Sequence, residues 1–267
     1  MKRILGLIIT SLLVLSFSFP VFAADSLTCW FSPGWTSKAA KAQAISAALS
    51  EESGISVRPR IAKSYPEVLT AFSTNEPQLV YVGSFVQAII NARGLGTALV
   101  QNINGKDLYS GVLVYPKGGD PAAILKNSPA EIAFARGASS GESSAKAATA
   151  GQAAIGVANH GASCGAVKAG KAKAAVVKNW WWDANKGKFP ELDMYLIPDV
   201  SINKNPDNVL TASKAVSAEI QAKITAAAIA RKDVFGAPEM VPFDQARLAY
   251  PLELMQKGKI DPLTYSW

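Results

Sequence analysis

The chain has 267 residues, of which 49% are hydrophobic, and carries a formal net charge of +7 at neutral pH. A chain of this length buries enough surface to fold without disulfide staples, as one large domain or as two lobes. Lys and Arg are scattered rather than clustered, which argues against a nucleic-acid-binding protein, and one histidine with two distant cysteines argues against a metal site of the usual Cys/His kind.

The N-terminus has the pattern of a secretory signal peptide. The basic residues Lys2 and Arg3 precede an apolar run at 4–19, and the small residues Val21 and Ala23 follow it. We expect residues 1–23 to be removed. No cysteine stands at the expected cleavage point, so no lipid anchor is expected, and no later stretch reaches the roughly 20 apolar residues of a membrane helix.

The first part of the chain alternates between predicted strands and helices. Pro59 cannot donate to a ladder, so its strand should lie at a sheet edge. The break at 117–121 is where we expect the chain to change lobe. The predicted strands are 27–31, 55–60, 78–82, 97–101 and 109–115, and the predicted helices are 38–49, 65–73 and 85–92.

The second part continues in the same way. The predicted strands are 132–135, 153–158, 174–177, 192–197 and 209–212, and the predicted helices are 160–169, 216–231 and a short one that follows 242–244 and ends near 249, with a further segment at 252–257. Alternating strands and helices are typical of an α/β protein with mainly parallel sheets.

The small polar turn at 138–144 lies between a predicted strand and an Ala-rich helix. Its hydroxyl and N–H groups at a helix N-terminus could hold an anion, because the positive end of the helix dipole points there. The alternative is a capping box, since Ser139 and Glu142 have the required spacing and could satisfy only the helix itself.

Several segments, in order, resemble the periplasmic phosphonate-, phosphite- and phosphate-binding proteins, the solute-binding components of ABC importers. The segments that carry this resemblance are 64–69 with 79–86, 109–114, 134–141, 159–162 with 166–171, and the helix from 216 followed by 242–244. They span nearly all of the chain after residue 23.

The resemblance implies a type II periplasmic binding protein with two α/β lobes. Lobe 1 would comprise 24–112 and 208–267, and lobe 2 would comprise 113–207, with crossovers near 113–117 and 197–203. The ligand would be a small phosphorus oxyanion (phosphonate, phosphite or phosphate) held between the lobes. The protein would be a monomer that delivers this ligand to an ABC permease, with no cofactor and no enzymatic activity.

The resemblance also implies a ligand site of hydroxyls, phenols, an imidazole and backbone N–H groups. Its expected members are Ser139, Ser140, Gly141, Tyr65, Tyr109, His160 and the turn Gly83-Ser84. Without the resemblance, the tyrosines could equally be core residues and the histidine a surface residue.

Two residues depart from the family pattern. Glu142 stands where a neutral residue is more usual, and its carboxylate would lower anion affinity unless it points away or caps Ser139. Lys173 stands where the family commonly has an acidic residue. No acidic pair is evident for an aminoalkyl group, which argues against 2-aminoethylphosphonate.

Other interpretations stay open. The run 180–182 of three tryptophans could wall the ligand site or pack into the lobe. Cys29 and Cys164 are expected in different lobes as free thiols. A hydrolase could pair Ser139 or Ser140 with His160, but no G-x-S-x-G motif and no third group is evident. A sensory protein for a small anion would use the same site.

Overall fold

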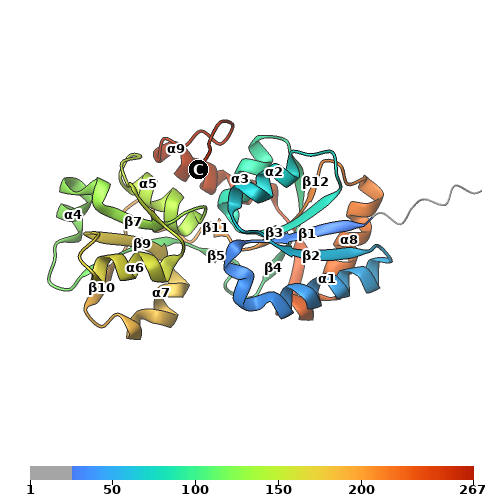
Figure 1. Cartoon of the computed structure of the whole chain (residues 1–267), viewed down its shortest axis with the longest axis horizontal. Coiled ribbons are helices and arrows are strands. Elements are labelled where there is room, and N and C mark those ends of the chain that lie inside the picture. Colours follow the sequence, from blue (N-terminus) through green and yellow to red (C-terminus); the bar gives the residue numbers. More distant parts are fainter. Residues whose placement is uncertain (1–25) are drawn as a thin grey trace, which may run out of the picture.

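The computed structural model describes residues 26–267, which form two lobes lying side by side (Figure 1). The predicted signal peptide at 1–23 lies outside the described residues. Each lobe is a mixed β-sheet with helices on both faces, which confirms the predicted α/β class. The prediction of mainly parallel sheets is wrong in detail, because strands that return from the other lobe pair antiparallel with their neighbours.

The first lobe contains a six-stranded sheet. In spatial order its strands are β13 (Glu239–Pro242), β4 (Gly96–Ile103), β12 (Val209–Ser213), β3 (Gln78–Val82), β1 (Leu27–Phe31) and β2 (Val57–Ile61). Helices α1 (Ala39–Ser53) and α8 (Ala218–Ala230) cover one face, and α2 (Tyr65–Phe72) and α3 (Ser84–Ala92) cover the other. As predicted, the strand that contains Pro59 lies at an edge.

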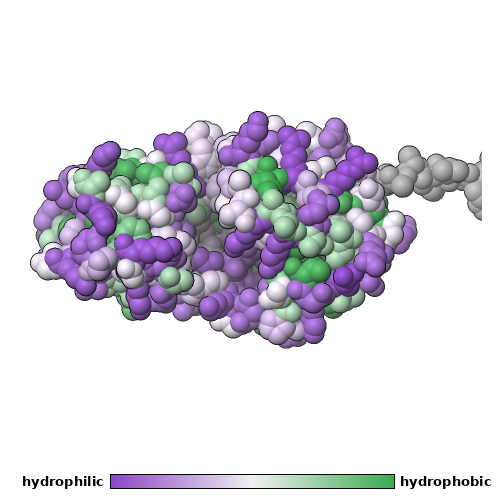
Figure 2. Space-filling model, turned by 60° about the horizontal axis from the view of Figure 1, so that its bottom comes forward, coloured by the Kyte–Doolittle hydropathy of each residue, from purple (hydrophilic) through white to green (hydrophobic). Residues whose placement is uncertain are grey.

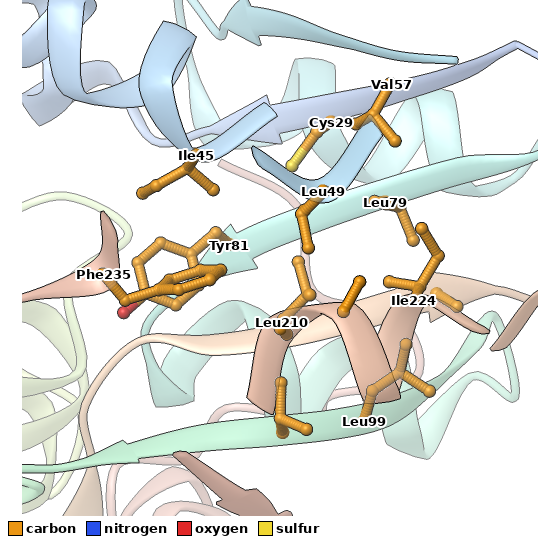
Figure 3. Packing of buried hydrophobic residues seen from close by; sticks show 14 of the residues in the cluster. Cys29, Ile45, Leu49, Val57, Leu79, Tyr81, Leu99, Leu210, Ile224 and Phe235 are labelled. Carbon is orange, nitrogen blue, oxygen red and sulfur yellow. The ribbon is translucent and has the colours of Figure 1, made fainter. Parts of the chain in front are cut away.

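Strand β1 shows how the sequence builds two cores on this sheet. Alternate side chains of a strand point to opposite faces, and Cys29 and Phe31 pack under α1 and α8 while Trp30 packs under α2 and α3. In Figure 3, Ile45 and Leu49 of α1 point toward this side of the sheet.

The second lobe contains a five-stranded sheet. In spatial order its strands are β10 (Leu192–Tyr195), β6 (Gly111–Pro116), β9 (Ala174–Lys178), β7 (Ile132–Ala135) and β8 (Ile155–Val157). Helices α4 (Pro121–Asn127) and α5 (Ser144–Ala148) pack on one face, and α6 (His160–Lys168) and α7 (Asn179–Asn185) pack on the other.

Side-chain caps fix the starts of several helices. The hydroxyl of Ser64 caps α2, the carboxylate of Asp120 caps α4, the amide oxygen of Asn159 caps α6, and the hydroxyl of Ser217 caps α8. Each cap accepts a backbone N–H that has no partner inside its helix. The caps therefore fix where these helices begin relative to the strands before them.

A short two-stranded ladder joins the lobes. Strand β5 (Leu108–Tyr109) pairs antiparallel with β11 (Asn205–Pro206). The first crossover was predicted at 113–117 and the change of lobe near 117–121, and both positions are too late along the chain. Residues 113–114 pair with β9 inside the second sheet, because a buried apolar run forms a central strand rather than a connection.

Helix α9 (Ala249–Lys257) lies against both lobes, at the top of Figure 1. Its Tyr250 and Leu254 belong to a core cluster of the second lobe, whereas Met255 belongs to a cluster of the first. The lobe boundaries of the sequence analysis stay a prediction. The structure adds that the segment after residue 248 contacts the lobe to which it was not assigned.

The two cysteines are buried in different lobes, Cys29 in β1 and Cys164 in α6, and both thiols are free, as predicted. Burial raises the pKa of each thiol to about 12, so neither is reactive at neutral pH. None of the helices in residues 26–267 has the length and apolar character needed to span a bilayer.

Candidate functional site

A cavity of about 130 Å³ lies between the lobes, beside the β5–β11 ladder. Figure 2 shows a hollow where the two halves of the molecule meet. The cavity draws its lining from both lobes and from the connections between them. The lining residues are Ser32, Tyr65, Gly83, Tyr109, Gly137, Ala138, Ser139, Ser140, His160, Lys178, Asp207 and Asn208.

The polar turn after β7 forms one wall of this cavity. Residues Ser139–Ser143 form a single π-helical turn that leads into α5. The N–H groups of Ser139 and Ser140 begin this turn and find no acceptor in the described part of the chain. Two unpaired donors at the positive end of a helix are suited to hold an anion.

The capping-box interpretation of this turn is wrong. Ser139 donates its hydroxyl to Oδ1 of Asn205 at 2.9 Å and makes no side-chain cap. The carboxylate of Glu142 instead accepts the N–H of Gly137 at 2.7 Å and lines a different cavity. Glu142 therefore points away from the cavity between the lobes, which is one of the two arrangements in which it would not repel an anion there.

Asn205 connects hydroxyl groups at the junction of the lobes. Its buried Oδ1 accepts from Ser139 and, at 3.5 Å, from Ser84 of the first lobe. The Ser84 hydroxyl also lies 2.9 Å from the Tyr109 hydroxyl. Ser84 thus stands behind the cavity wall and positions Tyr109, rather than lining the cavity as its turn partner Gly83 does.

The two predicted tyrosines both line the cavity. Burial raises the pKa of Tyr65 and of Tyr109, so both phenols stay protonated and can donate hydrogen bonds at neutral pH. Gly137 has a positive φ of 71° and its Cα lies against the Tyr65 ring, where a side chain would collide. This glycine lets the two walls of the cavity approach.

His160 lies at the start of α6, with Nε2 3.3 Å from the Ser140 hydroxyl. Its buried Nδ1 has no hydrogen-bond partner among the described residues. Burial, and then the charge of Lys178, lower the pKa of His160 to about 3. The imidazole is therefore neutral at pH 7 and offers a polar group rather than a positive charge.

This neutral histidine predicts a pH-dependent stability. Between pH 6.5 and about 3 the unfolded chain binds a proton at His160 that the folded chain does not, so folding stability falls as pH falls. Relative to His160→Gln, the wild type should lose about 2 kcal/mol of unfolding free energy between pH 7 and pH 5. Urea unfolding of both proteins at the two pH values measures this difference, and parallel pH dependences would contradict it.

Lys178 supplies the positive charge that the sequence analysis did not identify. Its Nζ lies 2.7 Å from Oδ1 of Asp207 and 4.2 Å from the ring centres of both Tyr109 and Trp180. Burial lowers the pKa of Lys178 while the Asp207 carboxylate opposes that shift. Its position at the carboxyl end of β9 was the available signal, because α/β sheets bind ligands at strand carboxyl ends.

The three tryptophans divide between the core and the rear of the site. Trp182 is buried in the core of the second lobe. Trp181 packs 5.7 Å from the His160 ring, and Trp180 packs on Lys178 and Tyr109. None of the three lines the cavity, so they support residues that do.

Gly141 does not line the cavity but supports the turn that does, because its Cα packs closely against Ala135 at the end of β7.

Across 26–267 no group of three His, Cys, Asp or Glu side chains could hold a metal ion. The cavity thus combines neutral donors, two N–H groups and one ammonium group paired with a carboxylate. This arrangement can hold a small anion by hydrogen bonds.

Comparison with known proteins places the chain in a family. The profile of the ABC transporter phosphonate periplasmic substrate-binding proteins matches residues 36–233. PhnD1 from Prochlorococcus marinus, solved with methylphosphonate, has 16% identity and a TM-score of 0.68 over 88% of this chain and 98% of its own. A binding component of a phosphonate ABC transporter from Pseudomonas aeruginosa has 13% identity and a TM-score of 0.68 over 88% and 87%.

A third similar structure is XAC2383 from Xanthomonas citri bound to ATP, with 11% identity and a TM-score of 0.68 over 88% of this chain and 97% of its own. No curated protein sequence matches the chain. These structures share the two-lobed fold, and the profile covers most of the described residues. The chain belongs to the periplasmic substrate-binding proteins of phosphonate ABC transporters.

Proposed function

We propose that this protein binds a small phosphorus oxyanion in the cavity between its lobes and delivers it to an ABC permease. The observation that carries the proposal is that Tyr65 of one lobe and Ser139, Ser140 and Lys178 of the other line one cavity. A ligand touching both walls would favour the closed arrangement of the lobes. Closure is then the signal that a permease can read.

The size of the cavity narrows the ligand class. Its volume of about 130 Å³ equals that of roughly four water molecules. Phosphite, phosphate or methylphosphonate is small enough for this space, whereas a nucleotide such as the ATP bound to XAC2383 would have to extend beyond it. The methyl group of methylphosphonate would find apolar surface on the Tyr65 and Tyr109 rings.

The same geometry argues against a hydrolase. Ser140 and His160 lie 3.3 Å apart, as a nucleophile and base would. A histidine with a pKa of about 3 is a poor base at neutral pH, and its Nδ1 has no orienting partner in residues 26–267. We therefore assign the pair to ligand binding without catalysis.

The charge balance disfavours an aminoalkyl phosphonate. One carboxylate, Asp207, does line the cavity, but Lys178 already neutralises it. A ligand ammonium group would have to compete with Lys178 for that carboxylate.

We further propose that residues 1–23 direct the protein to the periplasm, where it acts as a monomer without a lipid anchor.

A thermal-shift screen tests the ligand class. Phosphite, methylphosphonate, phosphate, sulfate, acetate and ATP are each added to the purified protein, because a ligand that binds only the folded state must raise the melting temperature. We expect one or more of the three phosphorus oxyanions to raise it, and ATP and acetate to leave it unchanged. Stabilisation by sulfate or acetate alone would contradict the proposal.

Ser140→Ala and Tyr65→Phe should each weaken binding of the stabilising anion by about 1–3 kcal/mol, the usual cost of losing a hydrogen bond to a charged group. Isothermal titration calorimetry gives this directly. Tyr115→Phe is the matched control, since Tyr115 lies on β6 outside the cavity lining. Unchanged affinity in both site variants would contradict the assignment of these residues.

A further inference from the structure

The buried carboxylate of Glu142 gathers donors from distant parts of the chain. It accepts the Gly137 N–H at 2.7 Å, the Trp267 indole N–H at 2.8 Å and the Tyr265 hydroxyl, and it pairs with Lys146 at 3.1 Å. Two of these donors belong to the segment 261–267, which follows α9. Glu142 itself belongs to the second lobe, on the turn that forms a wall of the ligand cavity.

Lys146 of the second lobe also donates to the Tyr265 hydroxyl at 2.9 Å, and further attachments tie segment 261–267 to the first lobe. Arg93, at the end of α3, donates to the carbonyl oxygens of Pro262 at 2.8 Å and of Tyr265 at 2.6 Å. The rings of Tyr265 and Trp267 pack 5.7 Å and 5.6 Å from the ring of Phe85 on α3. The segment therefore links the lobes in addition to β5, β11 and α9.

This link reaches the ligand cavity from both sides. The Trp267 ring stacks on Tyr65 at 6.2 Å with an interplanar angle of 28°, and Tyr65 lines the cavity from the first lobe. On the opposite wall, Glu142 holds the N–H of Gly137, whose positive φ begins the turn that presents Ser139 and Ser140. One indole ring thus contacts a ligand-facing phenol and, through Glu142, the ligand-facing turn.

We propose that segment 261–267 is an interlobe link, and that Glu142 and Trp267 are positioning residues that hold Tyr65 and the turn 137–140 at the spacing the ligand requires. The part of this inference that concerns ligand binding rests on the proposed function. The part that concerns the link between the lobes rests on the contacts described above. Hydrogen bonds to a buried carboxylate are short and strong, so they resist separation of the lobes. Breaking them lets the lobes separate before ligand binds.

The test compares two tryptophans whose indole N–H groups donate at the same distance, one to a residue of the other lobe and one to a residue of its own lobe. Trp267→Phe removes an indole donor 2.8 Å from Glu142 of the other lobe, and Trp30→Phe removes an indole donor 2.8 Å from Gln78 of its own lobe. Tyr265→Phe is a second link variant, because it keeps the packing on Phe85 and loses the hydroxyl. Glu142→Ala and Glu142→Gln complete the set, since glutamine keeps one acceptor oxygen.

Two quantities are measured for each variant. Spin labels on Asn75→Cys and Asn127→Cys, exposed residues of the two lobes, report the interlobe distance without ligand. The native thiols do not interfere, because both are buried. Calorimetry reports the affinity for methylphosphonate.

Trp267→Phe and Tyr265→Phe should broaden the interlobe distance distribution and raise the Kd for methylphosphonate roughly fivefold, in line with the usual net contribution of one hydrogen bond. Glu142→Ala should raise it about twentyfold by the same reasoning, and Glu142→Gln should fall in between. If Trp267 acts through Glu142, the double variant with alanine at 142 and phenylalanine at 267 is no weaker than Glu142→Ala alone.

Trp30→Phe should lower the melting temperature and leave both the interlobe distance and the Kd unchanged. Link variants that behave like Trp30→Phe, losing stability alone, would overturn the inference. If the wild type binds no phosphorus oxyanion, the proposed function fails. The ligand-free distance distributions then still decide whether the segment links the lobes.

Discussion

Replacing Lys178 by methionine is expected to weaken binding of the phosphorus oxyanion by about 3 kcal/mol, roughly a hundredfold. Lys178 carries the one positive charge among the cavity-lining side chains, since His160 is neutral. In the wild type the ammonium group lies 2.7 Å from the Asp207 carboxylate. Without it, this carboxylate faces the bound anion with its negative charge uncompensated. Methionine keeps the apolar part of the lysine chain, so the packing against Tyr109 and Trp180 is largely retained.

The partner residue provides the matched control for this prediction. Asp207→Asn alone should tighten binding, because it removes a negative charge from the cavity and frees Lys178 to pair with the ligand. The double variant, methionine at 178 with asparagine at 207, should recover part of the lost affinity. Calorimetry of the three variants checks the series, and a Lys178→Met variant that binds like the wild type would contradict the role of the ammonium group.

Gly141→Ala is expected to abolish measurable binding and to lower stability by about 1–3 kcal/mol, as overpacking does. A Cβ at 141 would lie 2.8 Å from the carbonyl oxygen and 2.9 Å from the nitrogen of Ala135. Both atoms are backbone of β7, so the turn itself must move, and the N–H groups of Ser139 and Ser140 move with it.

Gly165→Ala is the control for that change. Gly165 lies inside α6 of the same lobe, and a Cβ there would meet no atom within 4 Å. Alanine at 165 should therefore raise stability by about 0.5–1 kcal/mol and leave the affinity unchanged. Urea unfolding and calorimetry of both variants make the comparison. If the two variants had the same stability and the same affinity, close packing of Gly141 against β7 would not be needed for binding.

Most of the fold follows from local sequence patterns. The predicted strands and helices occur close to their expected positions because apolar periodicity and caps such as Asn159 act within a few residues. The antiparallel direction of pairing at β12 and β6 could not be predicted from these local patterns. Whether β12 runs parallel or antiparallel to β3 depends on where the chain returns from the second lobe, and no local pattern encodes that return.

The predicted strand 109–115 is a second case in which local sequence does not determine the structure, here because of a single residue. The apolar run predicts one strand, whereas the structure divides it at Ser110 into β5, which joins the lobes, and β6, which enters the second sheet. The division depends on Asn179, whose N–H donates to the Ser110 carbonyl oxygen at 3.1 Å and whose side chain accepts the Ser110 N–H at 3.3 Å. Such a contact across 69 positions cannot be read from the run itself.

The site was foreseen where a motif or the family resemblance supplied it. Tyr65, Tyr109, Ser139, Ser140 and His160 all line one cavity, and whether they bind the ligand stays a prediction. Two further residues of the cavity, Lys178 and Asp207, were not predicted because neither belongs to a recognisable sequence motif. Lys178 and Asp207 lie 29 positions apart and meet because one ends β9 while the other follows β11.

Glu142 illustrates why a side chain's direction needs the whole fold. In the sequence it has the spacing of a capping residue, and the turn alone would let it cap Ser139. The structure turns it toward Trp267, 125 positions away, where three donors and a lysine stabilise its charge. The same contact keeps the carboxylate out of the cavity between the lobes, so an acidic residue in this turn is compatible with the proposed anion binding.

A crystal structure of the protein grown with methylphosphonate tests the central claim most directly. The account predicts the phosphorus atom in the cavity between Tyr65 and Ser140, with its oxygens within hydrogen-bond distance of the Ser139 and Ser140 N–H groups and of Lys178 Nζ. A second cavity, of about 330 Å³, lies beside Arg136 and Lys146 and offers an alternative cationic site. Phosphonate found there, with the cavity between the lobes holding only water, would contradict the account.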